Sequence, residues 1–103
     1  MEFMHIGVPV EEKDESFVYS DDMKLYFTNP DDDEFKCEYL KFMEETIFPQ
    51  PIQKNVHVAF KVDDLKPYLE TCEVIVEPMD VNEHLTCAFV IRNGLVLELM
   101  YMH

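Results

Sequence analysis

Near the end of the chain, the stretch LVLELMYM is apolar at every position except Glu98 and Tyr101. Successive side chains of a strand point to opposite faces of a sheet, so Leu95, Leu97 and Leu99 share one face. Glu98 lies on the other face. A carboxylate in the middle of such a run is costly to enclose unless a metal ion or a positive group pairs with it. The stretch is therefore predicted to be a strand with a core face of leucines and a second face that carries a charge.

The region before this strand has the pattern of a strand, a helix and two more strands. VHVAFKV is the first strand, and Asp63 and Asp64 after it are typical of a helix start, so DLKPYLET is predicted to be helical. Pro67 would fall in the first turn, where its missing N–H is tolerated. EVIVEP and LTCAFVIR are the other two strands, and the Asn93–Gly94 pair predicts a hairpin turn before the last strand.

The first half predicts strands only. EFMHIGVPV forms the opening strand, and MKLYFT and FKCEYLKF form a hairpin around NPDDDE. NPDDDE lacks the glycine and the distal glutamate of an EF-hand loop, which favours a solvated turn over a calcium site. MEETIFPQPIQK, residues 43–54, contains two prolines and is predicted to cross to the second half without regular structure.

Length and charge limit what the protein can bind. The 103 residues suit one domain, and 22 acidic against 8 basic residues give a net charge of −14. Arg92 is the only arginine, so no basic stripe is present to bind nucleic acid or an anionic membrane surface. Cys37, Cys72 and Cys87 have no CxxC spacing and lie in apolar runs, as expected of reduced thiols in a cytoplasmic protein. A small-molecule ligand is the expected partner.

His57 begins the strand VHVAFKV and faces away from the side that the helix can cover. A single histidine in such a run is more often a hydrogen-bonded core residue than a metal ligand. Alternation places it on the same face as Glu98, however, and the first half offers a matching pair, with His5 on its opening strand and Glu38 in FKCEYLKF. Two imidazoles and two carboxylates suit a divalent metal such as Zn, Ni, Co, Mn or Fe.

The other two histidines, His84 and His103, lie in a loop and at the C-terminus. Surface positions are expected for both of them. They are therefore left out of the candidate site.

The stretches HIGVPV, CEYLKF, HVAFKVDDL and GLVLELM resemble the glyoxalase, bleomycin-resistance and extradiol-dioxygenase superfamily, also called vicinal oxygen chelate proteins. Members are built from two βαβββ modules whose strands form a cup-shaped mixed sheet around a metal. The resemblance implies an α+β fold of this kind. It also implies that His5, Glu38, His57 and Glu98 are the metal ligands.

The resemblance implies a single glyoxalase-like domain over residues 1–103. Residues 1–43 would be an abridged first module that lacks its helix, because this part shows no helical period. Residues 44–54 would be the crossing segment, and residues 55–103 the second βαβββ module.

Two functions are compatible with this resemblance. The first is a metal-dependent lyase or isomerase of the glyoxalase type, in which the ion acts as a Lewis acid on a small molecule with adjacent oxygens and Glu98 or Glu38 carries a proton. Glutathione fits poorly as a co-substrate, because its carboxylates would need arginines. The second is a non-catalytic protein of the bleomycin-resistance type that sequesters a small ligand without metal.

The missing helix also predicts a homodimer. Five outward-facing residues of the first module would have no helix to cover them: Met4, Ile6, Val8, Cys37 and Tyr39. An apolar patch of this kind is rarely left to water, and a second copy of the chain is its simplest cover.

Overall fold

The computed structural model describes residues 1–103 as an α+β protein with eight strands in a mixed sheet and a few short helices. In chain order the elements are β1 (Glu2–Pro9), β2 (Val18–Ser20), β3 (Leu25–Phe27), the 3-10 helix η1 (Pro30–Asp32), β4 (Cys37–Phe42), α1 (Gln50–Lys54), β5 (His57–Lys61), α2 (Lys66–Thr71), β6 (Glu73–Asn82), β7 (Leu85–Arg92) and β8 (Leu95–Met102). No helix has the length and apolar character needed to span a membrane.

The chain forms two units, which are described one at a time. The N-terminal unit is His5–Val56, and the C-terminal unit combines Met1–Met4 with His57–His103. Strand β1 therefore contributes its first residues to one unit and the rest to the other.

The C-terminal unit has the βαβββ order that the sequence predicts. Strand β5 pairs parallel with β8, β8 pairs antiparallel with β7, and β7 pairs antiparallel with β6. The spatial order is β5-β8-β7-β6, so β8 lies between two neighbours. Parallel strands need a crossover connection, and here it runs through α2 and the β6–β7 hairpin.

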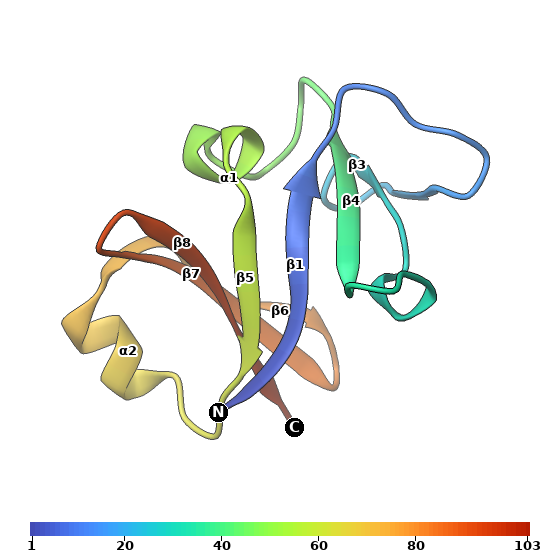
Figure 1. Ribbon diagram of the computed structural model, residues 1–103. Helices are drawn as coiled ribbons and strands as arrows, with labels where there is room; N and C mark the ends of the chain where they lie inside the picture. Colours follow the sequence, from blue (N-terminus) through green and yellow to red (C-terminus); the bar gives the residue numbers. More distant parts are fainter. The chain divides into compact units, whose positions relative to one another are not determined.

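Helix α2 covers one face of this unit, as shown in Figure 1. Val62, Val90 and Leu99 form the buried centre of that face, and Tyr68 and Leu69 of the helix pack against them. The leucine face of β8 is thus core, as predicted, except at its first residue. Leu95 is 46% exposed because it sits at the hairpin end of the strand.

The helix begins later than predicted. Leu65 is its N-cap residue, and neither Asp63 nor Asp64 occupies that position. The Asp64 carboxylate instead accepts a hydrogen bond from the Lys66 amide at 3.1 Å, so it still serves one of the unpaired donors at the helix start. Pro67 lies in the first turn, as expected.

The hairpin turn between β7 and β8 is formed as predicted. Asn93 and Gly94 both have positive φ, at 51° and 82°, the conformation that a two-residue type I′ turn requires. The outer strand β6 runs longer than EVIVEP, and its pairing with β7 shifts register at three places between Val74 and Asn82.

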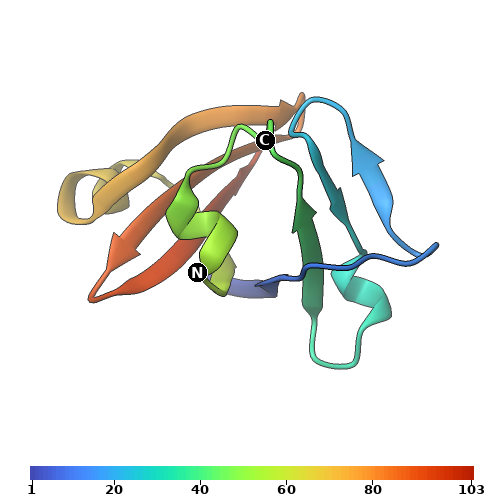
Figure 2. The same cartoon turned by 90° about the horizontal axis from the view of Figure 1, so that it is seen from above.

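The N-terminal unit repeats the same strand order without the helix. Strand β1 pairs parallel with β4, β4 pairs antiparallel with β3, and β3 pairs antiparallel with β2; Figure 2 shows β2, β3 and β4 side by side. Residues 10–17 connect β1 to β2 as a loop. Within it the Asp14 carboxylate accepts bonds from the amide and hydroxyl of Ser16, and these bonds lower the pKa of Asp14.

Strand β2 was not predicted from the sequence. It has only three residues, and Val18 and Tyr19 are both exposed, so no alternation marks it. Its pairing with β3 and the contact between the Tyr19 and Tyr26 rings, 4.8 Å apart, define it instead.

In the turn at NPDDDE, the side chains of Asn29 and Asp33 accept hydrogen bonds from the local backbone. Asn29 accepts a bond from the Asp31 amide at 2.9 Å, and Asp33 accepts bonds from the amides of Phe35 and Cys37. The expected hairpin between β3 and β4 is present, and these side-chain to backbone hydrogen bonds stabilise its turn.

The crossing segment was expected to have no regular structure, and this prediction was wrong. Residues 50–54 form helix α1, with Pro49 as N-cap and Pro51 in the first turn, where both prolines are compatible with a helix. Ile52 and Phe48 are buried, and the Phe48 ring lies 6.0 Å from that of Phe42. Packing of these two apolar residues, which the prolines do not prevent, accounts for the ordered segment.

The outward face of the N-terminal unit is smaller than the sequence suggested. Met4 does not belong to it, because Met4 packs against Ala59, Cys87 and Met100 in the C-terminal unit. The remaining four residues of the set are half-buried: Ile6, Val8, Cys37 and Tyr39. By alternation, Phe48 lies with Phe42 on the opposite face of β4 from Tyr39, so α1 does not cover this patch through Phe48.

We expect the patch to mediate a homodimer. Analytical ultracentrifugation at tens of micromolar protein should give the mass of two chains, and Ile6→Asp or Tyr39→Asp should shift it toward one chain by placing a charge in the contact. Leu95→Asp, at an exposed apolar residue elsewhere, is the control and should leave the mass unchanged. A single-chain mass for the unsubstituted protein would contradict the prediction.

Candidate metal centre

A buried histidine and a buried glutamate lie side by side in the C-terminal unit. In the parallel pairing of β5 with β8, His57 is opposite Val96 and Ala59 is opposite Glu98, so His57 and Glu98 share a face. Nε2 of His57 is 3.2 Å from Oε1 of Glu98. Their side chains are only 2% and 12% exposed, so the carboxylate is enclosed as the sequence analysis anticipated.

The second oxygen of this carboxylate has a contact that the sequence analysis missed. Cys87 on β7 donates a hydrogen bond to Oε2 of Glu98, with the sulfur 3.3 Å away. The His57 ring meets the Phe89 ring edge-on, with centroids 5.2 Å apart. From the sequence, Cys87 is expected only to be a reduced thiol in an apolar run. Its alternation with Phe89 in LTCAFVIR would have placed it on the Glu98 face once the β7–β8 hairpin was assumed.

The face that carries the pair is itself apolar. Ala59, Cys87 and Met100 form a buried cluster there, and Met4, Val81 and Leu85 pack against it. Alternation along β8 predicts a core on the leucine face only. The nearly continuous apolar run LTCAFVIR, which is typical of a strand buried on both faces, is the signal for the second core.

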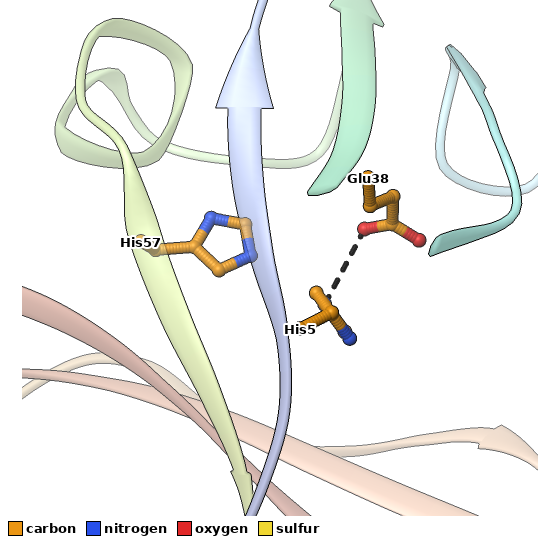
Figure 3. A group of neighbouring side chains, drawn as sticks. All are labelled: His5, Glu38 and His57. Carbon is orange, nitrogen blue, oxygen red and sulfur yellow. Dashed lines mark ion pairs between the residues drawn. The ribbon is translucent and has the colours of Figure 1, made fainter. Parts of the chain in front are cut away.

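The N-terminal unit holds a corresponding pair. In the parallel pairing of β1 with β4, Gly7 is opposite Glu38, and His5 lies two residues before Gly7 on the same face. Nε2 of His5 is 3.5 Å from Oε1 of Glu38, the ion pair that Figure 3 marks with a dashed line; the figure also labels His57, a residue of the C-terminal unit. The side chains of His5 and Glu38 are 8% and 20% exposed.

The distances within the pairs are compatible with shared metal ligation. Two ligand atoms that each lie about 2.1 Å from an ion are about 3.0 Å apart at an octahedral angle and about 3.4 Å apart at a tetrahedral angle. The 3.2 Å and 3.5 Å separations fall at or near this range. Imidazole nitrogen and carboxylate oxygen are the donors that Zn, Co, Ni, Mn and Fe accept together. The same distances also suit a hydrogen-bonded ion pair.

The remaining histidines lie on the surface, as predicted. His84 is exposed, with its Nε2 3.9 Å from a carboxylate oxygen of Glu83. His103 is also exposed, and its Nε2 lies 2.7 Å from the Thr86 hydroxyl. Both are suitable control positions for experiments on His5 and His57.

Comparison with known proteins gives a fold but no function. No protein-family model matches the chain, and no curated protein matches it. Among solved structures, a hypothetical protein from Bacillus halodurans C-125 is similar, with a TM-score of 0.61 over 99% of this chain and 94% of that chain. The two sequences are 15% identical, so the likeness concerns the fold alone. The chain is thus a small α+β protein with a mixed eight-stranded sheet, a fold shared with that bacterial protein.

The burial of Glu98 predicts the sign of a stability change. Glu98→Leu removes a carboxylate that contacts both His57 and Cys87, and it leaves polar groups of those two residues without this partner. We expect the free energy of unfolding, measured by urea denaturation in the presence of a chelator, to fall by about 1–3 kcal/mol. Glu38→Leu, at a more exposed carboxylate, is the comparison and should cost less.

A gain in stability for Glu98→Leu would contradict this expectation. It would mean that burying the Glu98 carboxylate costs more free energy than its contacts with His57 and Cys87 recover.

Proposed function

We propose that the protein is a metal-dependent enzyme of the vicinal oxygen chelate type, acting on a small molecule with adjacent oxygens. His5, Glu38, His57 and Glu98 would be the ligands of one divalent ion. The observation that carries the proposal is that each unit supplies one His–Glu pair, with donor atoms 3.5 Å and 3.2 Å apart.

The repeated topology supports this assignment. In each unit the first strand pairs parallel with the last, and the histidine comes from the first strand and the glutamate from the last. His5 on β1 corresponds to His57 on β5, and Glu38 on β4 corresponds to Glu98 on β8. A pair of βαβββ-like modules with ligands at equivalent positions is the arrangement that the sequence resemblance implies, with the first module lacking its helix.

The side chains of the pairs would carry out the proton transfer. A bound divalent ion would stabilise negative charge on the substrate oxygens. For a hydroxyketone, Glu98 or Glu38 would take the C–H proton from the carbon that bears the hydroxyl and return it to the former carbonyl carbon, while the hydroxyl proton moves to the former carbonyl oxygen, so the substrate is isomerised without loss of atoms. His5 and His57 would stay in place, because both are buried. The apolar cluster beside Glu98 would limit access of water to this transfer.

The charge of the chain favours an uncharged substrate. The net charge is −14, and Arg92, the only arginine, is exposed at the end of β7. Neither feature provides a binding site for the carboxylates of a glutathione adduct. A small neutral hydroxyketone is the substrate class that fits.

A metal-free binding protein is the second candidate. One observation favours it: each His–Glu pair is within ion-pair distance, an arrangement that neutralises the carboxylate without a metal. Such a protein would sequester a small ligand and would catalyse nothing.

Metal binding by histidine variants separates these two functions. Purified protein dialysed against Zn²⁺, Co²⁺ or Ni²⁺ should hold about one ion per chain by elemental analysis. His5→Ala and His57→Ala should each strongly reduce the amount of bound metal, because each substitution removes one of the four proposed ligands. His84→Ala should retain the ion, since His84 is exposed.

The possible outcomes point to different functions. Loss of the ion in His57→Ala but not in His5→Ala would place the metal in the C-terminal unit alone. No bound ion in the unsubstituted protein, together with an unchanged melting temperature on addition of a chelator, would favour the binding protein.

The proton transfer has its own test. Nuclear magnetic resonance in D₂O should detect exchange of the C–H proton of small hydroxyketones in the presence of metal-loaded protein. Either Glu98→Gln or Glu38→Gln should abolish this exchange, and the variant that does so identifies the base, because an amide cannot accept the proton. A rate equal to that of the free metal ion would contradict the proposed reaction.

A further inference from the structure

Cys87 is a buried thiol that the proposed reaction does not use. It lies on β7, where the antiparallel pairing with β8 places Cys87 opposite Met100 and Phe89 opposite Glu98. Cys87 and Glu98 therefore share a face, and the sulfur is 3.3 Å from Oε2 of the carboxylate. The thiol is only 2% exposed.

The apolar surroundings of the thiol strengthen its hydrogen bond to Glu98. Ala59 and Met100 form the buried cluster with Cys87, and the half-buried Val81 and Leu85 pack against it. A thiol is a weak donor, but a charged acceptor in an apolar environment strengthens the hydrogen bond. The bond is therefore able to fix the orientation of the Glu98 carboxylate.

We infer that Cys87 is a positioning residue for Glu98. By holding Oε2, the thiol turns Oε1 toward His57, so that Glu98 binds the ion through one oxygen. This inference rests on the proposed metal-dependent function. It deepens that function by naming a determinant of metal preference, because single-oxygen ligation suits small ions such as Zn²⁺, whereas Ca²⁺ often takes both oxygens of a carboxylate.

The first measurement is metal affinity by calorimetry, with Zn²⁺ and Ca²⁺ as probes. Cys87→Ala should weaken Zn²⁺ binding by about 10-fold, the usual effect of removing a group that orients a ligand. The loss for Ca²⁺ should be smaller, a difference that a purely structural role would not produce. Cys87→Ser keeps a donor and should stay within about threefold of the unsubstituted protein. Cys72→Ala, in the cluster on the other face, is the control and should not change affinity.

The second measurement reads the hydrogen bond without metal. The S–H stretching band lies in a region of the infrared spectrum that other protein groups leave clear. One such band should be shifted to lower frequency by the bond to Glu98, should disappear in Cys87→Ser, and should move in Glu98→Gln. This arm does not need Cys87→Ala to fold.

Each result supports or overturns the inference. A Cys87 band that does not respond to Glu98→Gln, or equal Zn²⁺ affinity in the unsubstituted protein and Cys87→Ala, overturns it and leaves the proposed function standing. A thiolate charge-transfer band in the Co²⁺ spectrum also overturns it, because Cys87 would then be a ligand. Absence of metal binding in the unsubstituted protein removes the proposed function and this role together, whatever the S–H band shows.

Discussion

A carboxylate enclosed in an interior strand is the constraint on which the C-terminal unit depends. Strand β8 has neighbours on both sides and buried residues on both faces, so Glu98 has little access to water. An uncompensated charge in such a place costs several kcal/mol. Two residues around it relieve that cost, because His57 contacts one carboxylate oxygen and Cys87 donates a hydrogen bond to the other.

Each unit contains one His–Glu pair, and the two pairs differ in how much solvent reaches them. The glutamate of the N-terminal unit is more exposed than that of the C-terminal unit, and no α2 equivalent lies between β1 and β2. The N-terminal unit has the same strand order without such a helix, because the order depends on pairing of β1 with β4 and of β3 with both β4 and β2. The parallel pairing of first and last strands is therefore the part of the module that sets each His–Glu pair.

The sequence predicts the elements whose side-chain pattern is strong. Strands β7 and β8 begin and end where expected, and alternation with the leucine face as core places His57 with Glu98. The pairing of His5 with Glu38 is predicted by analogy with the second half and by the family resemblance, and the structure brings these two residues to 3.5 Å. Helix α1 and strand β2 could not be predicted in this way. Both elements are short, and local sequence preference does not determine them. Helix α1 is stabilised by the burial of Ile52, and β2 is stabilised by its pairing with β3.

Contacts between strands are harder to predict than faces. The bond from Cys87 to Glu98 depends on the register of β7 against β8 and on the conformations of the two side chains. The predicted turn at Asn93–Gly94 gives the register, but no pattern in the sequence gives the conformations. The placement of Met4 illustrates the same limit. Its apolar side chain suggested an exposed patch, and only the structure shows that it packs against Ala59 and Met100.

The division of β1 between the two units has a consequence for how the chain folds. The first four residues belong with the last 47, so the C-terminal unit depends on contacts between opposite ends of the sequence. Such distant contacts carry a large loop-closure cost and slow the search for the native state. During synthesis, Met4 cannot find its place until Cys87 and Met100 have left the ribosome, so this unit completes its folding only after strand β8 has been made.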